Sequence, residues 1–255
     1  MSASIRFRLS LMMFVQYFIW GAWWVPLGTL LAKNGFDEII GQVYATQGYA
    51  AILAPLFIGM IADRYFAAEK VMGVLHLCGA ACLFYLSTLG PGTDPQHMVL
   101  AVLAYMIFYM PTLPLSTTIA FNASTDTTKQ FPTIRVFGTL GWIVAGLGIG
   151  FARLEQTNIP ILISAAASLA YGLYSFTLPH TPPRAGREPI NPVRLLGLDA
   201  LKGGGRLFVI FIVASLMTTI PLSFYYAYTN TFLIESGVDR AAAIQTLGQM
   251  SEMAF

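Results

Sequence analysis

The feature that most constrains this chain is the recurrence of apolar segments, separated by short polar connections. A helix of about 20 apolar residues crosses the hydrocarbon core of a bilayer. We count seven full segments and part of an eighth, at 9–31, 40–62, 70–90, 97–121, 132–152, 158–178, 207–233 and from 240 onward. The composition, 56% hydrophobic and only 10% charged, agrees with this count. The sequence therefore predicts an all-α integral membrane protein.

One connection between these segments is long. Residues 179–206 form a basic linker rich in proline and glycine, which is typical of a boundary between two structural units. We therefore predict a six-helix transmembrane bundle at 1–178, a linker at 179–206 and the start of a second bundle at 207–255. The last apolar segment stops in mid-pattern, so we expect a chain cut early in its second bundle.

Lysine and arginine are distributed unevenly between the two sides of the predicted membrane. If the segments alternate in direction, Lys33, Arg153 and Arg240 fall on one side. The other side carries Arg6, Arg8, Arg64, Lys70, Lys129, Arg184, Arg187, Arg194, Lys202 and Arg206. Because cytoplasmic loops carry the excess of basic residues, we expect the N-terminus and the linker in the cytoplasm.

The fifth segment opens with an arginine inside an apolar helix. In FPTIRVFGTLGW, residues 131–142, the side chains of Arg135, Thr139 and Trp142 stand at i, i+4 and i+7 and share one face. An intramembrane charge costs at least ~2.5 kcal/mol, so a partner or a ligand is expected for it. A guanidinium that snorkels to the headgroups is the alternative. The pair Gly146 and Gly150 indicates close helix packing and favours an inward-facing arginine.

Two other segments in the N-terminal part carry polar or helix-breaking patterns. Gln16, Trp20 and Trp23 share a face in the first segment, which suits a flat ligand but equally suits core packing. Gly21 beside them permits a close neighbour. Pro111 and Pro114 are expected to interrupt the fourth segment, with nearby hydroxyls bonding the freed backbone groups.

The segments after the linker carry two further polar faces. Pro221 is predicted to break the seventh helix, and Ser223, Tyr226 and Asn230 follow it. An aromatic belt at the membrane interface is the alternative for this stretch. Gln245, Gln249 and Glu252 share a face of the last segment. Burial raises the pKa of a carboxyl and a nearby cation lowers it again, so Glu252 is a candidate proton carrier.

Several classes of function find no support in the sequence. No nucleophile–base triad, phosphate-binding loop or metal-ligand spacing is present, and Cys78 and Cys82 suit packing roles. The net charge of +2 is too small to indicate a nucleic-acid partner. We therefore expect no enzyme activity, no cofactor, no metal and no nucleic acid.

Short motifs spread along the whole chain resemble one family. FPTIRVFGTLGW, QYFIWGAWW, YMPTLPL, TLPH, LLGLDA, NTFL and GQMSE resemble the nucleoside:H⁺ symporter family of the major facilitator superfamily. The segment GMIADRYFAAEK resembles the superfamily's loop motif between the second and third helices. The resemblance implies a major facilitator fold, here the N-terminal six-helix bundle plus the first two helices of the C-terminal one, working by alternating access.

The resemblance also assigns roles to residues. It implies that Arg135, Thr139, Trp142, Gln249 and Glu252 line the nucleoside site, with Glu252 near the ribose or the proton. The polar faces described above add Gln16, Trp20, Ser223 and Tyr226 as further candidates. We expect proton coupling by Glu252 with Arg135, and gating by Asp63 and Arg64, for which a solvated turn is the alternative. Ser223 and Tyr226 replace the glutamine and asparagine of the family pattern, and Trp142 replaces a phenylalanine. The loss of these two amides affects which substrate fits, since a site built to hydrogen-bond its ligand discriminates strongly between substrates.

From these patterns we expect proton-coupled uptake of a nucleoside across a bacterial cytoplasmic membrane by a monomeric, multi-pass carrier. The expected partners are a nucleoside or similar small polar substrate, protons and the lipid bilayer. Two alternatives stay open: a proton symporter of the same fold for a sugar or other polar metabolite, and a non-transporting membrane sensor built on a carrier scaffold.

Overall fold

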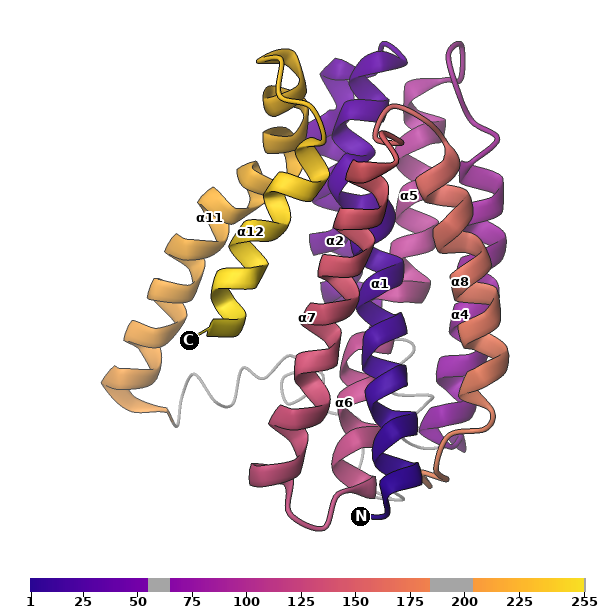
Figure 1. The fold of residues 1–255 in the computed structure, drawn as a ribbon, viewed down its shortest axis with the longest axis vertical. Coiled ribbons are helices and arrows are strands. Elements are labelled where there is room, and N and C mark those ends of the chain that lie inside the picture. Colours follow the sequence, from indigo (N-terminus) through magenta and orange to yellow (C-terminus); the bar gives the residue numbers. More distant parts are fainter. Residues whose placement is uncertain (55–64, 184–203, 255) are drawn as a thin grey trace.

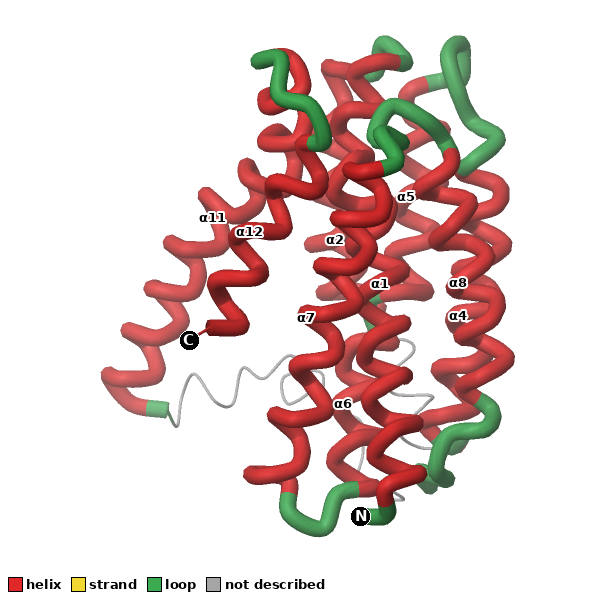
Figure 2. The backbone as a smooth tube through the Cα atoms, viewed as in Figure 1, coloured by secondary structure: helices red, strands yellow, loops and turns green. Residues whose placement is uncertain are grey.

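The computed structural model describes residues 1–54, 65–183 and 204–254, and for 252–254 the backbone alone. Within these ranges the regular structure is helical throughout, as Figure 2 shows. Seven α-helices of the described residues precede the linker: α1 (Ala3–Lys33), α2 (Ile40–Ala54), α4 (Ala68–Leu86), α5 (Pro95–Tyr109), α6 (Thr112–Ala123), α7 (Thr127–Phe151) and α8 (Ile159–Ser175). A 3₁₀ turn, Asp37–Ile39, precedes α2. After the linker come α11 (Gly205–Glu235) and α12 (Ala241–Ala254).

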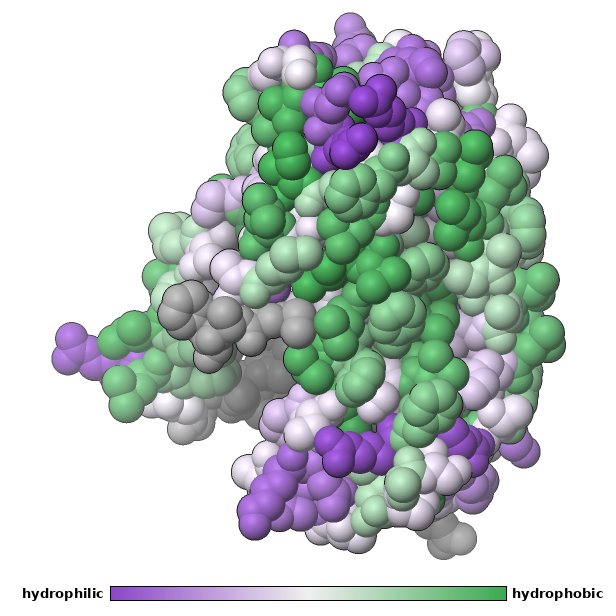
Figure 3. All heavy atoms as spheres, viewed as in Figure 1, coloured by the Kyte–Doolittle hydropathy of each residue, from purple (hydrophilic) through white to green (hydrophobic). Residues whose placement is uncertain are grey.

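The loops gather at the two ends of a bundle of elongated helices (Figure 1). We call one end the linker end; it carries the N-terminus, the loop 124–126 and residues 179–183. The far end carries the connections 34–39, 87–94, 152–158 and 236–240. Five helices among the described residues are long and apolar enough to cross a membrane. Apolar side chains cover the flank between the two more polar ends (Figure 3), so the predicted all-α membrane fold is confirmed.

Helix α1 lies in the middle of the molecule. It packs most extensively on α7, and it also contacts α8, α6, α2 and α11. Buried side chains run without a gap from Gly21 to Leu31, so this half of α1 is enclosed on all sides. As a result, α1 is the element on which the other helices are positioned.

The glycines of α7 permit close packing, as predicted. A Cβ at Gly146 would lie 2.5 Å from Thr246 Cγ2, and one at Gly150 would lie 2.7 Å from Ala243 Cβ. Both neighbours belong to α12. The Gly146 and Gly150 pair therefore joins the N-terminal helices to the part of the chain that follows the linker.

The two proline predictions have different outcomes. The fourth segment is interrupted, since α5 ends at Tyr109, α6 begins at Thr112, and the Thr112 hydroxyl donates to the Tyr109 carbonyl at 2.6 Å. The predicted break at Pro221 is wrong, because α11 continues through it. A membrane helix tolerates the loss of the one backbone hydrogen bond that proline removes, because the bonds on either side persist.

The helices after the linker meet the N-terminal helices at the far end and diverge from them toward the linker end (Figure 1). At the far end, Thr29 Oγ1 donates to Asn230 Oδ1 at 2.7 Å and Arg153 Nη2 lies 3.0 Å from Asp239 Oδ2. The molecule is thus closed at one end and splayed at the other.

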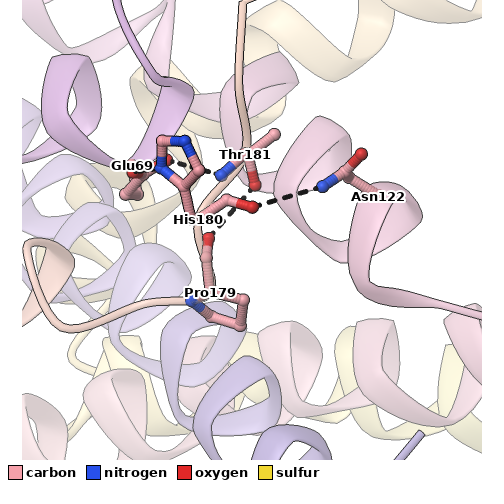
Figure 4. A network of polar contacts seen from close by, with 5 residues as sticks. All are labelled: Glu69, Asn122, Pro179, His180 and Thr181. Atoms are coloured by element: carbon pink, nitrogen blue, oxygen red, sulfur yellow. Dashed lines mark hydrogen bonds and ion pairs between the residues drawn. The ribbon is translucent and has the colours of Figure 1, made fainter.

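The chain leaving α8 is fastened to the start of α4 (Figure 4). The buried Glu69 carboxylate accepts from the Thr181 backbone N–H at 2.9 Å and lies 2.9 Å from His180 Nδ1. The Ala68 N–H donates to the Thr181 carbonyl at 3.0 Å, and Asn122 Nδ2 lies 3.5 Å from the His180 carbonyl. These bonds attach residues 180–181 to the N-terminal helices.

Candidate functional site

A cavity of about 160 Å³ lies between the N-terminal helices and the helices after the linker. Five helices supply its walls. Its lining residues are Tyr17, Trp20 and Trp24 of α1, Gln47 of α2, Arg135, Gly138, Thr139 and Trp142 of α7, Tyr226 of α11, and Gln249 of α12. Six residues predicted from sequence are therefore brought together: Trp20, Arg135, Thr139, Trp142, Tyr226 and Gln249.

The Arg135 guanidinium points inward rather than toward the membrane surface. Its central carbon lies 4.1 Å from the centroid of the Tyr17 ring. A cation at this distance over an aromatic face is attracted by the negative face of the ring. Arg135 lines the cavity one helical turn from Thr139, so the structure favours the inward-facing arginine over the snorkelling alternative.

Aromatic rings form one wall of the cavity. The Trp142 ring meets Trp20 edge-on, with centroids 5.5 Å apart, and Tyr226 at 5.8 Å. Gly21 makes room for it, because a Cβ there would lie 3.0 Å from Trp142 Cδ2. The predicted close neighbour of Gly21 is thus Trp142. These edge-to-face contacts fix the ring that was expected to stack on a ligand.

The cavity face of α1 is rotated by one residue from the predicted face. Tyr17, Trp20 and Trp24 line the cavity, whereas Gln16 is fully buried on the other side of α1. Gln16 Nε2 donates to Thr112 Oγ1 at 2.7 Å, and Gln16 Oε1 lies 3.1 Å from His76 Nε2. Gln16 therefore joins helices within the N-terminal block and does not reach the cavity.

His76 completes this internal polar network. Its Nδ1 lies 3.0 Å from Ser168 Oγ, and its ring meets Tyr171 edge-on, with centroids 4.4 Å apart. The network links α1, α4, α6 and α8 through side chains that satisfy one another. No sequence pattern joins His76 to Gln16, because the two residues are brought together only by helix packing.

Three polar side chains of the cavity are available to a ligand. Among the described residues, no hydrogen bond is found for the side chains of Gln47, Thr139 and Gln249. Each is partly exposed, and all three line the same cavity. Two amides and a hydroxyl thus join the Arg135 cation and the indole wall, which is a set suited to a polar ligand with a flat ring.

The remaining candidates lie elsewhere or outside the described part. Ser223 is exposed on α11, and its hydroxyl donates to the Thr219 carbonyl at 2.8 Å. It lines a neighbouring cavity of about 540 Å³ between α2 and α11. Glu252 belongs to α12, but its side chain lies outside the described residues, as do Asp63 and Arg64. The predicted Arg135–Glu252 pair stays a prediction.

Sequence reasoning missed Tyr17, Trp24, Gln47 and Gly138 as lining residues. Tyr17 had a signal, since it stands three positions before Trp20 on a helix. Gln47 had none, because α2 also carries Gln42 and the sequence does not say which amide faces inward.

Comparison with known proteins agrees with this fold. A family model described as nucleoside H⁺ symporter matches residues 3–255. The chain is 44% identical to the putative nucleoside transporter YegT of Escherichia coli (strain K12), over 97% of this chain and 60% of that relative. It is 33% identical to the xanthosine permease of the same organism, over 99% of this chain and 64% of that relative.

Solved structures give the same result. A crystal structure of a mutant of the nucleoside transporter NupG matches with a TM-score of 0.87 and 32% identity, over 98% of this chain and 66% of that one. Another structure of NupG matches with a TM-score of 0.82 and 31% identity, over 98% of this chain and 65% of that one. The chain thus spans 60–66% of the length of these relatives. The major facilitator fold implied by the motifs is confirmed, and the chain belongs to the nucleoside H⁺ symporter family.

Proposed function

We propose that the full-length protein is a proton-coupled nucleoside symporter of the bacterial cytoplasmic membrane, with its N-terminus and linker in the cytoplasm. The observation that carries this proposal is the cavity between the two sets of helices. A cation, a hydroxyl, amides and indole rings converge there from α1, α2, α7 and α12. A small site of aromatic walls with a few polar groups suits a ligand that has both a flat base and a hydroxylated sugar.

The ligand is held at the middle of the membrane in this proposal. Its base stacks against Trp142, and Thr139 and Gln249 hydrogen-bond its polar atoms. Family membership and the position of these residues on one cavity support the assignment. Tyr226 of α11 closes the aromatic wall from the other side.

Proton coupling rests on Arg135 and Glu252. In the proposal, the deprotonated Glu252 carboxylate attracts the Arg135 guanidinium across the cavity, and protonation weakens that attraction. The charge state of the carboxyl then decides how closely α12 approaches α7. The Tyr17 ring holds the guanidinium on the cavity side, where such a carboxylate would find it.

Alternating access is supported by the shape of the molecule. The two sets of helices meet at the far end and diverge toward the linker end (Figure 1). A cavity in such an arrangement faces the linker side, and rocking of one set against the other would expose it to the opposite side.

The proposal is tested by uptake of radiolabelled uridine into proteoliposomes that contain the full-length protein, with and without an imposed pH gradient. We expect uptake to follow the gradient in wild type, and Glu252→Gln to lose that dependence. A variant that keeps gradient-driven uptake would contradict the role of Glu252. A panel of radiolabelled nucleosides and sugars tests the ligand. Uptake of a sugar and of no nucleoside would establish the alternative carrier function, and uptake of neither would favour a sensor.

A further inference from the structure

We propose that Gln47 determines specificity by reading the hydrogen-bonding edge of the base. This inference rests on the proposed nucleoside transport. Gln47 lines the central cavity together with Trp142 and Gln249, and it also lines the neighbouring cavity that contains Ser223. It is therefore the amide at the junction of the two cavities.

The backbone around Gln47 is fixed by an unusual contact between α2 and α1. The hydroxyl of Tyr44, one turn before Gln47, donates to the Trp24 carbonyl at 2.8 Å and accepts from the Gly28 N–H at 3.0 Å. These two backbone groups are four residues apart, so the tyrosine hydroxyl stands between groups that normally bond each other in a helix. The Tyr44 ring also packs on Trp24, with centroids 4.6 Å apart. The contacts of Tyr44 with α1 thus fix the position of α2 relative to the cavity, one helical turn from Gln47.

The chemistry of the amide suits a nucleobase. A primary amide donates one hydrogen bond and accepts another in one plane, and glutamine pairs in this bidentate manner with base edges. Uridine offers the matching pair, because its O4 accepts and its N3–H donates. Among the described residues Gln47 has no hydrogen-bond partner, so it is free to make both bonds. The indole wall fixes the base plane, and the amide then discriminates along its edge.

The test compares uridine with 3-methyluridine, whose methyl group removes the N3–H donor. In proteoliposomes, wild type is expected to prefer uridine by about fivefold or more in KM. Gln47→Met keeps the size of the side chain and removes its hydrogen bonds, so we expect the KM for uridine to rise and the preference to disappear. Gln42→Met is the matched control, since Gln42 is an exposed amide of the same helix outside both cavities.

The outcomes separate this inference from the proposed function. If wild type takes up no nucleoside, the proposed function fails and this inference fails with it. If wild type transports uridine but either ignores the N3 methyl group or keeps its preference in Gln47→Met, only the role of Gln47 is overturned. A folding defect lowers the maximal rate, which is normalised to the amount of protein in the vesicles by immunoblot, and leaves the ratio of the two KM values unchanged.

A second inference, carried by different contacts, concerns the far end of the molecule: the geometry points to a reciprocal arginine clasp that closes this end. Arg153, after α7, pairs with Asp239 at 3.0 Å, and Arg240, before α12, places its guanidinium carbon 5.2 Å from the Phe151 ring centroid. Each side thus offers a cation to the other. The backbone of both arginines is in the left-handed region, with φ of 54° at Arg153 and 61° at Arg240, a conformation that is uncommon for residues other than glycine.

Buried polar contacts lie below the clasp. Asn230 is 1% exposed; it accepts from Thr29 at 2.7 Å and donates to Gln245 Oε1 at 2.8 Å. The Glu155 carboxylate, also buried, accepts from the Ala242 N–H near the start of α12 at 3.4 Å. Polar groups that bond each other when the end is closed, and water when it is open, suit an interface that must separate repeatedly.

Crosslinking tests the clasp. In a background with Cys78 and Cys82 replaced by serine, Arg153→Cys with Asp239→Cys is joined by a short thiol-specific crosslinker. The exposed ion pair contributes little by itself, so uptake is expected before crosslinking. We expect uptake to stop after crosslinking and to return on reduction. The control pair, Lys33→Cys with Gln156→Cys, joins two far-end residues of the N-terminal block and should transport when crosslinked. These residues are neighbours, since Lys33 Nζ donates to the Gln156 backbone carbonyl at 2.9 Å. Uptake by the crosslinked clasp pair, or failure of that pair to crosslink, overturns the inference.

Discussion

The Arg135 guanidinium is held over the Tyr17 ring, and this contact places a positive charge on the cavity wall. A cation–π contact of this kind contributes about 0.5–2 kcal/mol, depending on how far the pair is desolvated. The charge of Arg135 and the ring of Tyr17 are therefore expected to act as one unit in ligand binding.

Replacement of Tyr17 tests this unit. Tyr17→Leu removes the aromatic face, and we expect the KM for uridine to rise about 2- to 30-fold. Tyr17→Phe keeps the face and should stay close to wild type. Equal KM values for the two variants in uptake kinetics would show that the ring does not position the guanidinium.

Gly138 leaves the space that the pair occupies. A Cβ at Gly138 would lie 2.6 Å from Arg135 Nη1 and 2.7 Å from Tyr17 Cδ2, so Gly138→Ala must displace both side chains. We expect transport to fall by an amount similar to that in Tyr17→Leu. Gly148→Ala on the same helix is the control, because no neighbouring atom lies within 4 Å of the position that its Cβ would take. Transport by both variants at the wild-type rate would contradict the crowding.

At the scale of single helices, the sequence predicted the faces of α7 and α1 unequally well. The face of α7 was readable because Arg135 and Thr139 are polar residues in an apolar helix, so their spacing defines a direction. The face of α1 was not readable, since large apolar and aromatic side chains surround the helix and its buried residues run on without a gap. Its true face was set by the burial of Gln16 against Thr112 and His76, which depends on three other helices.

Proline in α11 shows a related limit. The sequence marks Pro221 as a helix breaker, but a membrane environment favours the remaining backbone hydrogen bonds strongly enough to keep the helix continuous. Pro111 interrupts its helix at a place where a threonine hydroxyl takes over the freed carbonyl. Local sequence does not distinguish these outcomes, because the difference lies in the neighbouring groups.

The proline in α11 gives a prediction for the element. Pro221→Ala restores one backbone N–H, which completes the hydrogen bond to the Met217 carbonyl without changing the path of the helix. We expect the melting temperature of the detergent-solubilised protein to stay the same or rise by a few degrees, corresponding to about 1 kcal/mol. A large fall in melting temperature, measured by scanning fluorimetry, would mean that a bend at Pro221 is required.

For the whole molecule, the lengths of the apolar segments were enough to predict the order of the helices. They were not enough to predict the cavity, since its lining comes from five helices whose relative rotation is decided by packing. The amides of α2 illustrate this: Gln42 and Gln47 have equal standing in the sequence, and only the contact of Tyr44 with α1 places Gln47 inside.

The splayed linker end predicts one-sided access to the cavity. Thr139→Cys, in the background without Cys78 and Cys82, should react with a membrane-impermeant maleimide added on the linker side and only slowly with reagent added on the far side. Added nucleoside should slow the reaction if it occupies the cavity. Lys33→Cys at the far end is the control for sidedness, and equal rates of Thr139→Cys labelling from both sides would contradict the closed far end.

The hydrogen bond between the Thr181 N–H and the Glu69 carboxylate shortens the connection between the two sets of helices. The connection to α11 effectively begins after Thr181 and not at Ser175, where α8 ends. Residues 180–181 are bonded to the start of α4 and are therefore held against the N-terminal helices. A connection with fewer residues confines the second set of helices to a smaller volume and so raises its effective concentration next to the first. Glu69 lies in the first turn of α4, and its carboxylate bonds residues 180–181. Loss of this carboxylate would therefore release these residues and lengthen the connection, and would weaken the encounter of the two sets of helices during assembly more than the transport step itself.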